Sequence, residues 1–161
     1  MTLALEEYYT PPDGVHVGAG AEETGGRIAP FNPAGGRQNC AAAVAAFLKT
    51  MKTRILVTAE DIESQMGTKL GPNDDVLPPS KALGFVEEAA GVTLSGRPAT
   101  FGGPFADSLA AGDYVLLAQE HIMIGRVVGG RRIIYDVQNQ RFLSWTDAIK
   151  LYGVIGAYRV F

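Results

Sequence analysis

The spacing of apolar residues changes along this 161-residue chain from a helical pattern to an extended one. Cys40, Val44, Phe47, Leu48 and Met51 recur at the intervals that place side chains on one face of a helix. In the C-terminal part, short apolar runs alternate with turn residues, which is typical of strands. We therefore expect an α+β protein in which helices precede an antiparallel sheet.

Capping and turn residues bound the expected helices. Asn39 is a suitable N-cap, which makes Cys40 the first residue of its helix. Thr58 and Asp61 resemble a capping box, and Gly67 has the position of a C-terminal stop. Further elements follow: a strand-like segment at 54–57, a helix at 81–90, strands at 114–118, 122–128, 131–137 and 154–160, and a short helix between Ser144 and Gly153.

One domain is expected over residues 1–161, a length that can bury a sizeable core. Repeated Gly and Pro turn signals predict an irregular N-terminal arm at 1–38. The helical part then covers 39–91, and the antiparallel sheet part covers 112–161.

Composition excludes several classes of function. The net charge of -3 provides no basic surface, so we expect no nucleic-acid partner. No apolar run reaches the ~18 residues that span a bilayer, so we expect no membrane association. One cysteine and two histidines are too few for a structural zinc site, and we expect neither a metal nor another cofactor. The segment 1–10 carries Glu6 and Glu7 and does not resemble a Sec signal peptide, so export would need another route.

Cys40 is the first candidate for chemistry. A lone cysteine is often a small buried hydrophobe. At a helix start, however, unpaired backbone N–H groups and the helix dipole favour the thiolate, which is the nucleophilic form. The same N–H groups can stabilise an oxyanion.

A predicted hairpin supplies the second candidate. If Gly129-Gly130 is a two-residue turn, Val128 faces Arg131, and counting outwards brings His121 and Gln138 opposite each other. Asp136 then lies diagonally from His121 on the same face of the hairpin, within reach of a hydrogen bond. An acid that orients a histidine base completes the set that a cysteine hydrolase needs.

Two segments resemble the papain-fold toxin domains of bacterial polymorphic toxin systems. The first is 32–40, Asn-Pro-Ala-Gly-Gly-Arg-Gln-Asn-Cys, and the second combines His121 with Tyr135-Asp136-Val137-Gln138. The resemblance covers about residues 31–140. Many members carry a second cysteine three residues after the first, where this chain has Ala43.

The resemblance implies a papain-like cysteine hydrolase fold and a Cys40, His121 and Asp136 triad. Gln138 is then a supporting residue, and Gln38 and Asn39 are candidates for an extra oxyanion donor. It also implies a secretion-system effector, as in type VI secretion and interbacterial competition, that acts in the recipient-cell cytosol. Its substrate would be a target-cell protein, cleaved or deamidated at glutamine, and a cognate immunity protein would neutralise it.

Two alternatives remain open. Segments 112–115 and 121–125 faintly resemble NlpC/P60-like peptidoglycan amidases, although Asn39-Cys40-Ala41 lacks that family's Asp-Cys-Ser and the spacing from Cys40 to His121 is long for it. A non-catalytic papain-like binding module is the other alternative, and the intact Cys, His and Asp set argues against it.

Overall fold

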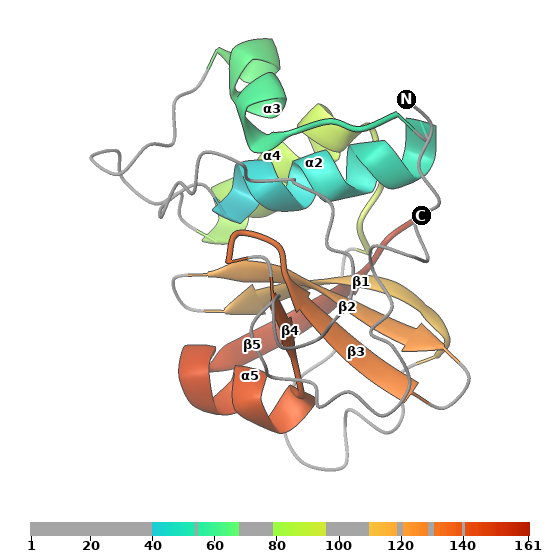
Figure 1. The fold of residues 1–161 in the computed structure, drawn as a ribbon, viewed down its shortest axis with the longest axis vertical. Helices are drawn as coiled ribbons and strands as arrows, with labels where there is room; N and C mark the ends of the chain where they lie inside the picture. Colours follow the sequence, from blue (N-terminus) through green and yellow to red (C-terminus); the bar gives the residue numbers. More distant parts are fainter. Residues whose placement is uncertain are drawn as a thin grey trace.

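Five strands and four helices make up the described part of the chain in the computed structural model, which describes residues 40–53, 55–67, 79–95, 110–118, 121–128, 131–139 and 141–161. The strands form one antiparallel sheet in the order β4-β3-β2-β1-β5. Helices α2, α3 and α4 lie over one face of this sheet, and α5 lies on the other side (Figure 1). The predicted α+β class is therefore confirmed. The bounds are α2 Cys40–Thr53, α3 Ala59–Met66, α4 Pro79–Ala90, β1 Gly112–Ala118, β2 Ile122–Val128, β3 Arg131–Asp136, β4 Arg141–Leu143, α5 Trp145–Tyr152 and β5 Val154–Arg159.

Helix α2 is the central helix of the larger apolar core. Every residue from Cys40 to Leu48 is at most 7% exposed, so the helix is buried around its circumference and not only along the predicted face. Many of these residues are alanines, whose small side chains let α3, α4 and the sheet approach the helix closely. The burial of α2 fixes the position of its first residue, Cys40.

Both predicted ends of α3 and the predicted C-terminal end of α4 agree with the structure, whereas α4 begins at Pro79, before the predicted start at 81. Thr58 accepts a hydrogen bond from the Asp61 backbone and Asp61 accepts one from the Thr58 backbone, which is the expected capping box. Gly67 follows α3 with φ of 64°, and Gly91 follows α4 with φ of 67°. Both glycines adopt the left-handed conformation that commonly ends a helix.

Strands β2 and β3 pair in the register that the sequence predicts. Val128 lies opposite Arg131 and Gly125 lies opposite Ile134, with the recorded pairing continuing to Ile124 and Tyr135. This register is the one that a two-residue turn requires. The turn residues, Gly129 and Gly130, lie outside the described residues, as does the predicted arm at 1–38.

The strand predicted at 54–57 is wrong. Ile55 makes a single bridge and is 55% exposed, and residues 56–58 have no regular structure. The Thr50 hydroxyl accepts a 2.9 Å hydrogen bond from the Val57 backbone, which holds this segment against α2 instead of in a sheet. Arg54 lies outside the described residues.

The prediction also placed the end of β3 one residue too late and missed the strand that follows it. Strand β3 ends at Asp136, not at Val137, because residues 137–139 form a turn. The chain then reverses so that Asp136 lies opposite Arg141 of β4. Strand β4 is only three residues long, too short for a clear alternating pattern.

The two faces of the sheet have separate apolar clusters. The cluster beneath α2, α3 and α4 includes Val115, Leu117, Ile122, Ile124 and Tyr135. The intervening residues face the other way, and a smaller cluster under α5 includes Tyr114, Leu116, Met123, Ile134 and Leu143. This alternation is the period of two that strands impose. The helices among the described residues are all too short or too polar to cross a membrane.

Candidate active site

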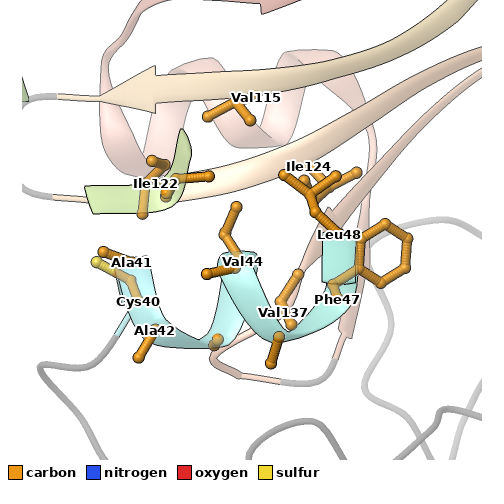
Figure 2. Packing of buried hydrophobic residues seen from close by; sticks show 14 of the residues in the cluster. Cys40, Ala41, Ala42, Val44, Phe47, Leu48, Val115, Ile122, Ile124 and Val137 are labelled. Atoms are coloured by element: carbon orange, nitrogen blue, oxygen red, sulfur yellow. The ribbon is translucent and has the colours of Figure 1, made fainter. Parts of the chain in front are cut away.

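Cys40 lies where the first turn of α2 meets the start of β2. Figure 2 shows Cys40 and Ala41 at the beginning of this helix, with Ile122 of β2 above them in the view. The three residues belong to one apolar cluster, and Cys40 is 7% exposed. The residue before Ile122 is His121, and the neighbouring Cys40 is one of the groups that raise the pKa of its imidazole. The thiol and the imidazole therefore lie close enough to interact.

His121 is oriented by Asp136. The distance between His121 Nε2 and Asp136 Oδ1 is 2.7 Å, and Asp136 is fully buried. A carboxylate only accepts hydrogen bonds, so Nε2 carries the donated hydrogen and Nδ1 is the ring nitrogen that remains for Cys40. In the neutral ring, this tautomer presents a basic nitrogen to the thiol, and transfer of the Cys40 proton to it gives the imidazolium.

The second oxygen of Asp136 has its own partners. Asp136 Oδ2 accepts hydrogen bonds from Asn139 Nδ2 at 2.8 Å, Arg141 Nε at 3.1 Å and the Tyr152 hydroxyl at 2.8 Å. The two carboxylate oxygens are thus divided between the imidazole and a group of donors from the turn, β4 and α5. With four donors, the carboxylate cannot rotate without losing hydrogen bonds.

The electrostatics of the pair favour a charged imidazole beside a charged carboxylate. Burial alone would lower the pKa of His121, but its hydrogen bonds and charge contacts with Asp136 and Cys40 raise this pKa from 6.5 to about 9. Burial would raise the pKa of Asp136, but its bonds to His121, Asn139 and Tyr152 lower it to about 2. The carboxylate is therefore ionised at neutral pH and stabilises an imidazolium.

The predicted site residues divide into three that come together, one that is buried in the turn after β3, and two that lie outside the described residues. His121 is hydrogen-bonded to Asp136 and interacts with Cys40, and the His121–Asp136 contact is the one that the hairpin register predicts. Gln138 is buried, but it lies in the turn after β3 and not on the strand. The oxyanion candidates Gln38 and Asn39 lie outside the described residues.

Sequence reasoning missed Asn139, Arg141 and Tyr152. The position of Arg141 opposite Asp136 could not be predicted, because it depends on the short strand β4. Tyr152 ends α5 just before Gly153, and a signal was present in the Ser144 cap, which places the C-terminal end of this helix. No spacing rule, however, directs that end towards Asp136.

A separate hollow lies at the other end of α2. It has a volume of ≈ 320 Å³ and is lined by Leu48, Met51, Lys52, Gly91, Val92, Asp113, Val160 and Phe161. Leu48 is already two turns along the helix from Cys40, or ~12 Å at 1.5 Å per residue. This hollow is therefore distinct from the surroundings of Cys40.

Comparison with protein-family models, curated proteins and solved structures gave no match for this chain. Within the described residues, no group of three or more His, Cys, Asp or Glu side chains is arranged to hold a metal ion. The chemistry that the described side chains support is proton transfer between Cys40 and His121, with Asp136 fixing the ring.

Proposed function

We propose that this protein is a papain-like cysteine hydrolase that acts on an amide group of a protein, with Cys40 as nucleophile, His121 as base and Asp136 as orienting acid. The arrangement of Cys40, His121 and Asp136, in which a 2.7 Å hydrogen bond joins His121 to Asp136 and Cys40 interacts with the same imidazole, is the single observation that carries the proposal. A nucleophile, a base within hydrogen-bond reach and a third group that orients the base form the usual signature of covalent catalysis.

The reaction begins when His121 takes the thiol proton and Cys40 Sγ attacks the amide carbon. A carbon–sulfur bond forms, and the negative charge moves to the carbonyl oxygen, where backbone N–H groups at the start of α2 can stabilise it. His121 then returns the proton to the departing nitrogen as the carbon–nitrogen bond breaks, leaving a thioester. Water, deprotonated by His121, attacks the thioester, releases the carboxylic acid and restores the thiol.

The departing nitrogen distinguishes the two forms of this hydrolase. If it belongs to a peptide bond, the protein is a protease, and if it belongs to a glutamine side chain, ammonia leaves and the protein is a deamidase. Both pass through the same thioester, so the Cys40–His121–Asp136 series serves either reaction.

The biological setting that we propose follows from the sequence resemblance. The protein acts as a toxin or effector domain in the cytosol of a recipient cell, reaches it by a non-Sec secretion route, and is neutralised by a cognate immunity protein. The segments that carry this part of the proposal are 32–40 and 135–138, with His121 between them.

Expression in two compartments of a naive bacterium tests the proposal. The wild-type protein should arrest growth from the cytoplasm, and Cys40→Ser should not, because a hydroxyl is a poorer nucleophile than a thiolate. Mass spectrometry of the host proteins should show new peptide ends for a protease, or a gain of one mass unit at glutamine for a deamidase.

The same experiment separates the alternatives. Growth arrest only after export to the periplasm, with cleaved peptidoglycan, would favour the wall amidase. If Cys40→Ser arrests growth as strongly as the wild type and no host protein changes, a binding module accounts for the chain better than a hydrolase.

A further inference from the structure

Tyr152, the last residue of α5, touches both members of the His121–Asp136 pair, and the proposed reaction gives it no role. Its ring stacks on the imidazole of His121 with a centroid distance of 4.3 Å and an angle of 29° between the planes. Its hydroxyl lies 2.8 Å from Asp136 Oδ2. One side chain thus contacts the base through its ring and the orienting acid through its hydroxyl.

Arg141 determines the direction of the Tyr152 hydroxyl. Arg141 Nη2 donates a hydrogen bond to this hydroxyl, and Arg141 Nε donates to Asp136 Oδ2 at 3.1 Å. A hydroxyl that accepts from a guanidinium must direct its own hydrogen elsewhere, and Asp136 Oδ2 is the acceptor within reach. Burial and the nearby Asp136 charge raise the pKa of Tyr152, which keeps the hydroxyl protonated as a donor.

We infer that Tyr152 is a positioning residue of this site, which holds the imidazole plane of His121 and the carboxylate of Asp136 in the geometry that Cys40 requires. The inference rests on the proposed function, since it concerns the same base. Tyr152 touches neither Cys40 nor a reacting atom in any recorded contact, so it acts through His121 and Asp136. Arg141 supports it by fixing the hydroxyl and by offsetting the Asp136 charge.

The position of α5 makes this role possible. Ser144 caps the helix by accepting a 3.0 Å hydrogen bond from the Asp147 backbone, and Ala148 anchors the helix in the smaller apolar cluster. The C-terminal end of α5 therefore has a fixed place against the sheet face from which Asp136 projects. A base held by packing and hydrogen bonds needs no reorganisation before proton transfer, whereas a misplacement of ~1 Å can cost a factor of about a hundred in rate.

Two substitutions separate the ring of Tyr152 from its hydroxyl. Tyr152→Phe keeps the stacked ring and removes the donor to Asp136, whereas Tyr152→Leu removes both. We expect the rate of Cys40 alkylation by iodoacetamide to fall about tenfold in the first variant and about a hundredfold in the second. Tyr114→Phe is the matched control, because it also loses one phenol hydrogen bond, to the Ala110 carbonyl at 2.7 Å, from the same apolar cluster.

A spectroscopic measurement distinguishes positioning from a general loss of structure. The Nε2 hydrogen that His121 donates to Asp136 should give a protected downfield resonance in the proton NMR spectrum of the wild type. Tyr152→Phe should keep a broadened signal and Tyr152→Leu should lose it, while circular dichroism shows that all variants are folded at the temperature used.

The outcomes separate this inference from the proposed function. If Tyr152→Leu keeps both the wild-type alkylation rate and the downfield signal, Tyr152 has no positioning role, whatever the protein's activity. If the Tyr152 variants behave as expected but the wild type changes no host protein, the positioning of His121 stands and the hydrolase proposal fails.

Discussion

The two faces of the sheet differ in what they contribute to the candidate site. The face beneath α2, α3 and α4 is apolar, and Cys40 lies at the start of a helix that is buried from Cys40 to Leu48. The face beneath α5 has a smaller apolar cluster, and beside it lie His121, Asp136 and the donors to Asp136. The position of the proposed nucleophile thus depends on hydrophobic packing, and the position of the proposed base depends on hydrogen bonds.

This difference predicts different responses to substitution. Packing is distributed over many side chains, so a change on the helix face should lower the free energy of unfolding while the surviving folded molecules stay active. The hydrogen-bonded group is compact, so a change on the α5 face should reduce activity more than stability accounts for.

Replacement of His121 should have the largest effect. His121→Gln preserves a polar side chain of similar length but removes the imidazole that is proposed to accept the Cys40 proton. Activity should fall by about three orders of magnitude or more, as for the members of known catalytic triads. This loss of activity can be measured as growth arrest on cytoplasmic expression and as the rate of host-protein modification. Retention of more than a tenth of the activity would remove His121 from the mechanism.

Truncation of Phe47 should produce the largest loss of stability on the helix face. Phe47 is 1% exposed in α2, and its ring packs edge-on against Tyr135 with centroids 5.6 Å apart. Phe47→Ala should lower the free energy of unfolding by about 3–5 kcal/mol, measured by urea titration. The folded fraction should still alkylate at Cys40 at nearly the wild-type rate. A loss of reactivity that exceeds the loss of folded protein would show that packing and chemistry are not separable here.

Asp136 should be more sensitive to substitution than Gln138. Asp136→Asn keeps one oxygen that can accept a hydrogen bond from His121. Its amide nitrogen, however, replaces Oδ2, which in the wild type accepts hydrogen bonds from Asn139 and Arg141. We expect partial activity and a loss of roughly 1–3 kcal/mol of stability from the unsatisfied donors. Gln138→Ala should cost less activity. If Gln138→Ala were inactive and Asp136→Ala active, the orienting role would belong to Gln138.

The stability of the fold should depend on pH through the same pair. The folded-state pKa of His121 is about 9, above its ordinary 6.5, so protonation of His121 stabilises the folded protein. This stabilisation is fully present below pH 6.5 and is lost as the pH rises through about 9. That difference corresponds to about 3 kcal/mol. The Asp136 pKa of about 2, below 3.8, gives stability that is present above 3.8 and lost as pH falls through about 2.

Urea titrations across this range measure both limbs. The free energy of unfolding should be highest between 3.8 and 6.5 as far as this pair is concerned. His121→Gln should flatten the alkaline limb relative to the wild type. Parallel alkaline limbs in the two proteins would show that His121 is not held charged in the folded state.

The α3 cap should show the smallest effect and no link to activity. Thr58→Ala removes the hydroxyl that accepts from the Asp61 backbone at 3.3 Å, on the helix side of the molecule. The expected loss is about 1 kcal/mol, seen as a small shift of the urea midpoint. Cys40 alkylation should be unchanged, and a slower rate would indicate coupling between α3 and the site.

Local signals predicted the elements that carry Cys40 and His121. The helical period around Val44, the capping box at Thr58 and the glycine after Met66 each act within a few residues, so no tertiary context is needed to interpret them. The hairpin register is also local, because Val128 and Arg131 are separated by only two residues. This is why the His121–Asp136 contact could be predicted without a structure.

The remaining parts depend on contacts between distant segments. The segment 54–57 has strand-forming residues, but the side chain of Thr50 holds it against α2. Arg141 and Tyr152 reach Asp136 only because β4 and α5 fold back onto β3. Tertiary packing decides these positions, and the spacing of residues within one segment does not record it.

The proposed role of Cys40 as nucleophile is best tested by the activity of Cys40→Ser. The substitution removes one sulfur at a buried position and leaves His121 and Asp136 in place. Cytoplasmic expression of the wild type should arrest growth and alter a host protein, whereas a folded Cys40→Ser protein at equal level should do neither. Full activity of Cys40→Ser would show that Cys40 is not the nucleophile.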